Sequence, residues 1–173
     1  TPLTFAMASS FTSRDNAIAN LKAEVSDIDS PDFCLMAARN ADKWVERFHT
    51  IDVETAETSK IDQFYGAFYR ASFLPREMSD CNGDYPRFSS GETKHMDSSL
   101  FTLPSSLSPH QSAGELSLYP PLGGRGAKYF GDFSMWDIYR AQLPLYNIIA
   151  PTLSGQMMQS LVDMYSSNGW LPI

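Results

Sequence analysis

The stretch FGDFSMWDIYRAQLP, residues 130–144, gathers aromatic and charged side chains at the start of a predicted helix. An ordinary core helix needs only apolar residues at such a place. Ser134 is a suitable N-cap, and Asp137 follows three positions later, which is the spacing of a capping box. Pro144 cannot donate a backbone hydrogen bond, so we expect it to bend or split the helix.

Asp137 has two interpretations. In the first, its carboxylate completes the capping box begun at Ser134, is favoured by the helix dipole and pairs with Arg140. The local pattern alone favours this structural role. In the second, Trp136, Asp137 and Arg140 bind a sugar, because sugar sites combine aromatic platforms with carboxylates and arginines. Asp132 and Asp137 also suggest the carboxylate pair of an inverting glycosidase, but acids at this spacing are common near helix starts, and we do not rely on it.

The composition indicates a globular chain and excludes several classes of function. The 173 residues are 43% hydrophobic, and 13 Lys and Arg against 20 Asp and Glu give a net charge of -7. Such a surface repels a nucleic-acid backbone. No apolar run approaches the roughly 20 residues of a membrane span, and no signal peptide is recognisable. Because the chain starts at Thr1 and stops in SSNGWLPI, we expect a piece of a longer protein.

Outside residues 130–144, apolar residues at three- and four-residue steps predict further helices. We expect a short strand over residues 3–10 and then five helical segments, so the fold class is all-α for this portion. Pro144 falls inside the fourth segment. The other segments are a helix capped by Thr12 or Ser13, a helix with Pro31 in its first turn that ends near Phe48, a helix with a capping box at Ser59 and Asp62 that ends before Pro75, and a helix from about Ser154 to a stop at Gly169.

Residues 86–128 are rich in Ser, Pro and Gly and have no sustained period, so we expect a long, partly mobile surface insertion. Cys34 and Cys81 do not form a C-x-x-C motif, and two half-buried free thiols are favoured over a disulfide. The histidines have no metal-ligand spacing and are not expected to bind metal or act as bases. They are His49, His95 and His110.

Several segments taken together resemble glycoside hydrolase family 92, a family of exo-acting α-mannosidases. The F-S-x-W-D-x-x-R block at residues 133–140 and the F-Y-x-x-x-Y-x-x-x-x-x-P block at residues 64–75 are the more specific ones. The blocks occur in the order of the family: FTSRDNAIANLKAE (11–24), Trp44 with IDV (51–53), FYGAFYRASFLP (64–75), NGDY (82–85), FSMWDIYRAQLPL (133–145) and SLVDMYSSNGWLP (160–172).

The resemblance implies a parent enzyme with an N-terminal β-sandwich, a helical linker and an (α/α)6 barrel that removes terminal mannose with inversion. Residues 1–10 would end the sandwich, residues 11–50 would be the linker, and residues 51–173 would begin the catalytic domain as a partial barrel. The resemblance assigns sugar binding to Trp136 and Asp137 and a supporting role to Arg140. It also implies calcium, a hard cation that takes oxygen ligands, but the ligands are not identifiable in this sequence.

The catalytic acid and base of the family lie beyond Ile173, so we expect no catalytic residue in this chain and no activity from it alone. Ile138 stands where the family usually has Thr, and the insertion is longer than the common pattern. The expected partners are mannose-containing glycans and the rest of the parent polypeptide, in a secreted or endomembrane lumenal location. The alternatives are a non-catalytic carbohydrate-binding module and a helical scaffold in which the acids are only caps.

Overall fold

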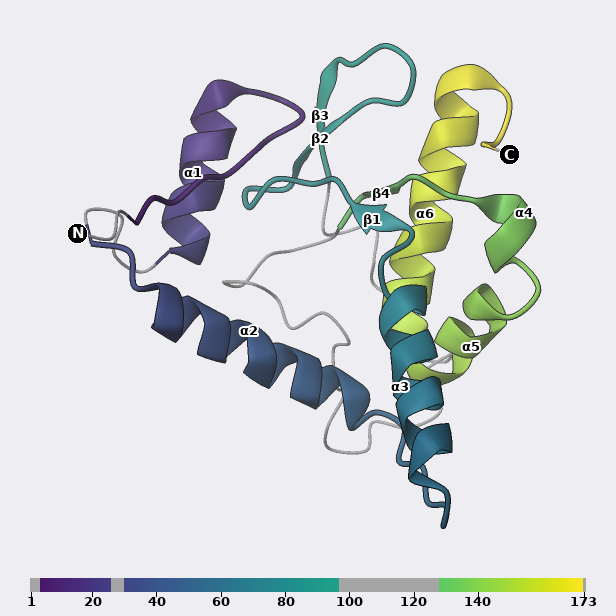
Figure 1. The fold of residues 1–173 in the computed structure, drawn as a ribbon. Helices are drawn as coiled ribbons and strands as arrows, with labels where there is room; N and C mark the ends of the chain where they lie inside the picture. Colours follow the sequence, from purple (N-terminus) through teal and green to yellow (C-terminus); the bar gives the residue numbers. More distant parts are fainter. Residues whose placement is uncertain (1–3, 26–29, 97–127, 173) are drawn as a thin grey trace.

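A computed structural model describes residues 4–25, 30–96 and 128–172 (Figure 1). The described residues are mostly helical, which confirms the coarser part of the fold prediction. Residues 4–10 form no strand, so the expected terminal strand is wrong for them. The elements are α1 (Arg14–Glu24), α2 (Phe33–Phe48), α3 (Thr58–Ala71), β1 (Arg76–Glu77), β2 (Asp84–Pro86), β3 (Thr93–His95), β4 (Phe130–Gly131), α4 (Met135–Ile138), α5 (Gln142–Ile149) and α6 (Pro151–Asn168).

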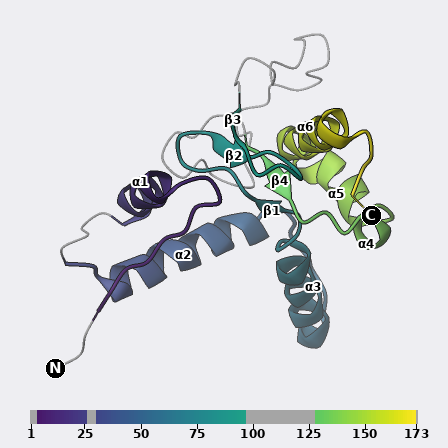
Figure 2. The ribbon, with the colours of Figure 1, turned by 90° about the horizontal axis from the view of Figure 1, so that it is seen from above.

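The first two helices lie apart from the C-terminal helices in both views of the ribbon (Figures 1 and 2). The Ser13 side chain caps α1 by accepting from the Asn16 amide, as predicted, yet α1 has no buried residue. Asp32 caps α2 through the Leu35 amide. Pro31 therefore precedes the cap and is not in the first turn of the helix, because an Asp side chain at the next position satisfies the free amide.

Helix α3 begins at Thr58 with Glu57 at the cap position, and no side chain caps it. The capping box predicted at Ser59 is therefore wrong, because Ser59 already lies inside the helix. Aromatic side chains join α3 to α2, and the rings of Trp44 and Tyr69 are 4.5 Å apart.

Two short antiparallel ribbons provide the strands. In the first, Arg76 of β1 is opposite Gly131 of β4, which brings together segments on either side of the insertion. The second is a hairpin of β2 and β3. The hairpin corrects our expectation for residues 86–128, since the start of this segment is regular structure. Residues 97–127 lie outside the described residues.

The predicted helix after Ser134 is split, as expected, but into the short α4 and the longer α5. The break lies at residues 139–141, and Pro144 falls in the first turn of α5, where its missing amide is tolerated. The last helix, α6, starts at Pro151, three residues before the predicted Ser154. It ends as predicted at Gly169, which adopts the left-handed conformation with φ 76°.

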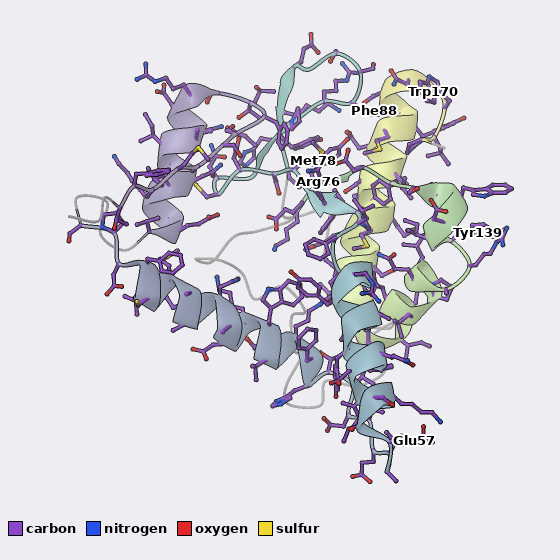
Figure 3. The ribbon with its side chains drawn as sticks, viewed as in Figure 1. Glu57, Arg76, Met78, Phe88, Tyr139 and Trp170 are labelled. Atoms are coloured by element: carbon purple, nitrogen blue, oxygen red, sulfur yellow. The ribbon has the colours of Figure 1, made fainter. Side chains whose placement is uncertain are left out.

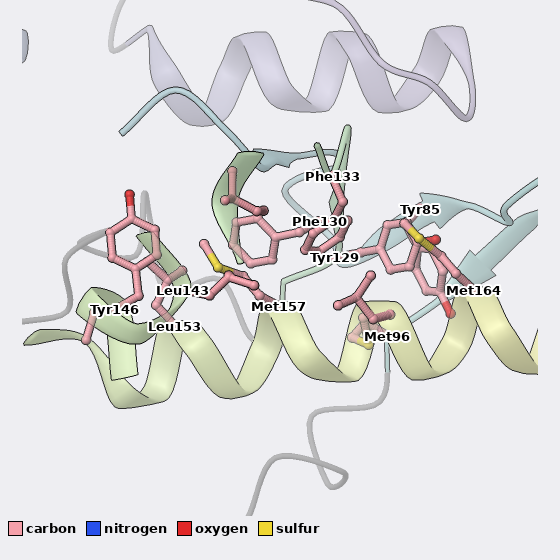
Figure 4. Close-up of a cluster of buried hydrophobic side chains, with 13 residues drawn as sticks. Tyr85, Met96, Tyr129, Phe130, Phe133, Leu143, Tyr146, Leu153, Met157 and Met164 are labelled. Atoms are coloured by element: carbon pink, nitrogen blue, oxygen red, sulfur yellow. The ribbon is translucent and has the colours of Figure 1, made fainter. Parts of the chain in front are cut away.

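The core lies along α6, where apolar residues recur at three- and four-residue steps (Figure 4). Phe130 of β4 packs over Met157, and the rings of Tyr85 and Tyr129 stack with centroids 4.1 Å apart. Burial and the charge of Asp163 raise the pKa of Tyr85 to about 12. The buried cluster consists of Tyr85, Met96, Tyr129, Phe130, Phe133, Ile138, Leu143, Tyr146, Ala150, Leu153, Met157, Leu161 and Met164.

None of the described helices combines the length and the apolar character that a membrane span requires. Cys34 and Cys81 are both free thiols, as favoured by the sequence. Cys34 is exposed, however, and only Cys81 is partly buried, because α2 turns few of its residues toward the rest of the chain.

Candidate functional site

Helix α4 follows β4 closely, and a buried side chain holds it in place at each end. Phe133 and Ile138 are both buried, with exposed fractions of 5% and 4%. They anchor the entry and the last residue of the helix in the core. Met135 also packs against the core, whereas Trp136 and Asp137 are exposed, so α4 presents these two side chains on the surface from a packed base.

The three residues that the sequence suggested for sugar binding lie together at α4. Trp136 is 70% exposed, which rules out core packing as its role in this chain. The Arg140 guanidinium lies 5.6 Å from the centre of the Trp136 ring and 5.2 Å from that of Tyr139. Its Nε also donates to the Tyr139 hydroxyl over 2.7 Å. Tyr139 points outward from α4 (Figure 3).

The capping box and the ion pair that the sequence predicted for Asp137 are not formed in the described part of the chain. Ser134 is at the N-cap position, but its side chain caps no amide. Its hydroxyl instead donates to Asp137 Oδ2 over 2.5 Å. The predicted ion pair between Asp137 and Arg140 is also absent from the described residues, because α4 ends at Ile138 and Arg140 is therefore outside the helix. Two of the three structural roles, the completed capping box and the ion pair, are therefore not found, whereas Asp137 is still an acid in the first turn of α4 and accepts a hydrogen bond from Ser134.

Asp132 is engaged elsewhere. Arg76 Nε donates to Asp132 Oδ2 over 2.6 Å, and Arg76 Nη2 contacts the same oxygen. The carboxylate is thereby held as a charged partner of a guanidinium. This arrangement gives no support to the idea that Asp132 and Asp137 act as a hydrolytic pair.

A second polar cluster, which our sequence reasoning missed as a site, joins α1 to the turn before β2. Asp80 is 4% exposed, and its carboxylate accepts hydrogen bonds from Ser10, Thr12, Asn16 and Asn20. The residues come from segments about 60 to 70 positions apart. Two of the family blocks mark this region in the sequence: FTSRDNAIANLKAE (11–24), which holds three of the donors, and NGDY, which begins two residues after Asp80.

Asp84, the first residue of β2, lies beside this cluster and contacts the opposite strand of the hairpin. His95 Nδ1 is 2.9 Å from Asp84 Oδ1, and Asn16 and Asn82 donate to Asp84 Oδ2. The hydrogen bond from His95, followed by that from Asn16, holds the pKa of Asp84 below its usual 3.8. His95 is therefore a hydrogen-bond partner of the Asp84 carboxylate. His49 is at the C-cap position of α2. His110 lies outside the described residues.

The described residues contain no group of three or more His, Cys, Asp or Glu side chains that could hold a metal ion. The Asp80 carboxylate is already used by hydrogen-bond donors. This part of the chain therefore does not fit the calcium ion that the resemblance implies.

A cavity of about 240 Å³ lies between the N-terminal segment and β1. Trp136, Asp137 and Arg140 do not line it. All three are exposed. The cavity is lined by Ser9, Ser10, Phe11, Asn20, Glu24, Glu77, Met78, Ser79 and Asp80.

Comparisons with known proteins bear on the family. A search of curated proteins found no match. Among solved structures, the chain is similar to a family GH92 alpha-mannosidase from Bacteroides thetaiotaomicron, with a TM-score of 0.70 and 20% sequence identity. The likeness covers 95% of this chain and 18% of the other chain, so the chain spans less than a fifth of its length. The model of the glycosyl hydrolase family 92 catalytic domain matches residues 16–173. The chain therefore belongs to glycosyl hydrolase family 92.

Proposed function

We propose that the chain is the sugar-binding part of an inverting, exo-acting α-mannosidase that hydrolyses terminal α-linked mannose from glycans. Membership of family 92 supports the class of enzyme. The observation that carries the assignment of this segment is the exposed group formed by Trp136 and Asp137 of α4 and by Arg140, which follows the helix. We keep the division into residues 1–10, 11–50 and 51–173, the barrel and the lumenal or secreted location as predictions.

Each member of the group has a role that suits a hexose. Ser134 holds Asp137 Oδ2, and in the described residues Oδ1 has no hydrogen-bond partner, so it is available to a sugar hydroxyl. The Trp136 indole offers an apolar face on which a sugar ring can stack. Arg140, already stacked on that indole, can donate from its remaining guanidinium hydrogens. These are binding roles, and we assign no catalytic acid or base to this chain.

The catalytic carboxylates and the calcium ligands are proposed to come from other parts of the full-length protein. The sugar-binding role of Trp136, Asp137 and Arg140 does not involve calcium, since the described residues offer no group of His, Cys, Asp or Glu to hold it. Calcium dependence is a separate proposal, and loss of activity on adding a chelator is its test.

The sugar-binding role is tested by hydrolysis of mannobiose by the full-length protein and its Asp137→Ala variant. A hydrogen bond to a charged group is worth roughly 1.5 to 3 kcal/mol, so kcat/KM should fall by about 10- to 150-fold. Asp15→Ala is the matched control, because Asp15 is also an exposed acid in a first helical turn but belongs to α1. Equal activity of wild type and Asp137→Ala would end the assignment of Asp137.

Two outcomes of the same work would favour the alternatives. Mannose binding by calorimetry without hydrolysis indicates a non-catalytic carbohydrate-binding module. A flat titration with mannose and mannobiose indicates a helical scaffold whose exposed acids have no ligand.

A further inference from the structure

Arg76 and Asp132 link the β1–β4 ribbon to the start of α4. Their side chains meet through Arg76 Nε and Asp132 Oδ2, 2.6 Å apart, although 56 positions separate them in the sequence. Arg76 is opposite Gly131 in the ribbon. Its side chain therefore contacts Asp132, the residue that follows its partner. The contact therefore ties the segment that leaves β4 to the neighbouring strand.

Asp132 also turns the backbone at this point. Its φ is 55°, and Ser89 is the one other non-glycine residue with a positive φ in the described part of the chain. Side chains disfavour this left-handed conformation, although Asp and Asn adopt it more readily than most. The turn redirects the chain from β4 into α4. In this conformation the Asp132 carboxylate accepts from Arg76.

The strand before the turn is fixed. Phe130 is fully buried, and its amide donates to Ser160 Oγ of α6 over 3.0 Å. Gly131 lies so close to Met78 that a Cβ would be 2.1 Å from the Met78 sulfur. Figure 3 labels Met78 and Arg76 beside this ribbon. Because β4 is closely packed, the chain changes direction at Asp132, between β4 and α4.

We propose that Arg76 and Asp132 are positioning residues for the sugar-binding group Trp136, Asp137 and Arg140. Both side chains are well exposed, with exposed fractions of 63% and 41%. Exposed ion pairs contribute little to stability. The pair therefore acts mainly on the geometry of α4. The part of the inference that concerns sugar rests on the proposed function, whereas the part that concerns the helix does not.

Hydrogen exchange tests the helix part in the full-length protein. The amides of Asp137 and Ile138 donate to the Ser134 carbonyl, so they report whether α4 is formed. In Arg76→Ala and Asp132→Ala, these amides should exchange about threefold faster, as expected for loss of one exposed ion pair. Unchanged exchange in both variants would overturn the proposal.

Two further variants separate the carboxylate from the backbone. Asp132→Gly removes the carboxylate but accepts the left-handed φ, and Asp132→Asn keeps the shape of the side chain without its charge. If the ion pair sets the helix, both variants exchange faster than wild type at α4. Wild-type exchange in Asp132→Gly would mean that the backbone alone makes the turn.

The matched control is Glu57→Ala. Glu57 forms an exposed ion pair with Lys60, with exposed fractions of 62% and 61%, at the far end of α3 (Figure 3). Removing it should leave exchange at α4 and activity unchanged. An equal effect in this control would show that the response is not specific to the pair at the ribbon.

Kinetics on mannobiose test the sugar part. Because small displacements of binding groups cost large factors in rate, Arg76→Ala and Asp132→Ala should each lower kcat/KM about tenfold. The double variant should show the same loss as each single variant, since both remove one contact, and Arg76→Lys should recover part of it. Losses that multiply in the double variant would contradict a shared role.

The two proposals fail in different ways. If Asp137→Ala is fully active, the proposed sugar site fails, and hydrogen exchange still decides whether Arg76 and Asp132 set α4. If Asp137→Ala loses activity while the Arg76 and Asp132 variants keep wild-type kinetics, the positioning role fails and the sugar site stands.

Discussion

Substitution of Gly131 by Ala tests the close packing of β4 on β1. A Cβ at Gly131 would lie 2.1 Å from Sδ and 3.1 Å from Cγ of Met78. Non-bonded heavy atoms normally stay about 3.5 to 4.0 Å apart, so the sulfur must retreat by roughly 1.5 Å. Met side chains adapt readily, and Met78 also borders the cavity, but it packs against the buried cluster, and a movement of this size changes that packing.

The expected cost follows from this overlap. Inserting one methyl group into packed surroundings destabilises by about 1 to 3 kcal/mol. Gly155→Ala is the matched control, because Gly155 is in α6 and a Cβ there meets no atom within 4 Å. In a helix interior this change should stabilise by about 0.5 to 1 kcal/mol. The same chemical substitution should thus have opposite signs at the two glycines.

Urea denaturation measures the change in stability of both variants. A shift of the unfolding midpoint at an unchanged m-value gives the change in the free energy of unfolding. A double variant with Met78→Ala identifies the cause. Met78→Ala should destabilise the wild type but be neutral or stabilising when Ala occupies position 131, because it removes the clash. The reasoning is refuted if Gly131→Ala stays within about 0.5 kcal/mol of wild type, or if Met78→Ala costs the same in both backgrounds.

Two further predictions concern hydrogen bonds. In Tyr146→Phe, the Ala71 carbonyl and Arg47 each lose a bond to the buried hydroxyl, and urea denaturation should show a loss of about 1 to 3 kcal/mol; an unchanged midpoint would contradict it. Because the pKa of Asp84 is lowered in the folded state, its contribution to stability is present above the unfolded pKa and is lost as the pH falls through the folded pKa. His95→Ala should raise the Asp84 pKa in a carbon NMR titration, and an unchanged value would refute the role of His95.

Local sequence pattern predicted the longer helices well. Helix α2 covers the predicted apolar period to Phe48, and α6 stops at Gly169, because periodicity and a left-handed cap are properties of the segment itself. The start of α3 was predicted less well. Ser59 and Asp62 have the spacing of a capping box, yet the helix begins earlier at Thr58, so a suitable motif does not fix the first turn.

The strands had little local signal. Strands β1 and β4 have two residues each, and they exist only because they pair across the insertion. The hairpin of β2 and β3 lies in a stretch whose composition indicated a loop. Contacts with α6 hold it, including Lys94 with Asp163 at 2.9 Å and Arg87 with Ser167 at 3.2 Å. Such contacts join residues about 70 to 80 positions apart, and no local window contains them.

The residue types of the candidate site were visible in the sequence, but their contacts were not. The three-residue spacing of Asp137 and Arg140 predicts a pair only if both lie on one helix. Because α4 ends at Ile138, Arg140 instead stacks on Trp136 and Tyr139. Phe133 before α4 and Ile138 at its end are buried in the core, and such burial depends on the whole fold.

The two sides of the molecule are held by different forces, and the candidate site belongs to the better packed one. Helix α1 has no buried residue, and hydrogen bonds to the buried Asp80 fix its place. Such bonds depend on direction, so they specify the orientation of α1 more than they add stability. Helix α4 instead stands on Phe133 and Ile138, which pack into the cluster along α6. The exposed side chains of the proposed site therefore stand on a packed base, and the hydrogen bond from Ser134 to Asp137 and the stacking of Arg140 on Trp136 add to the order of the group.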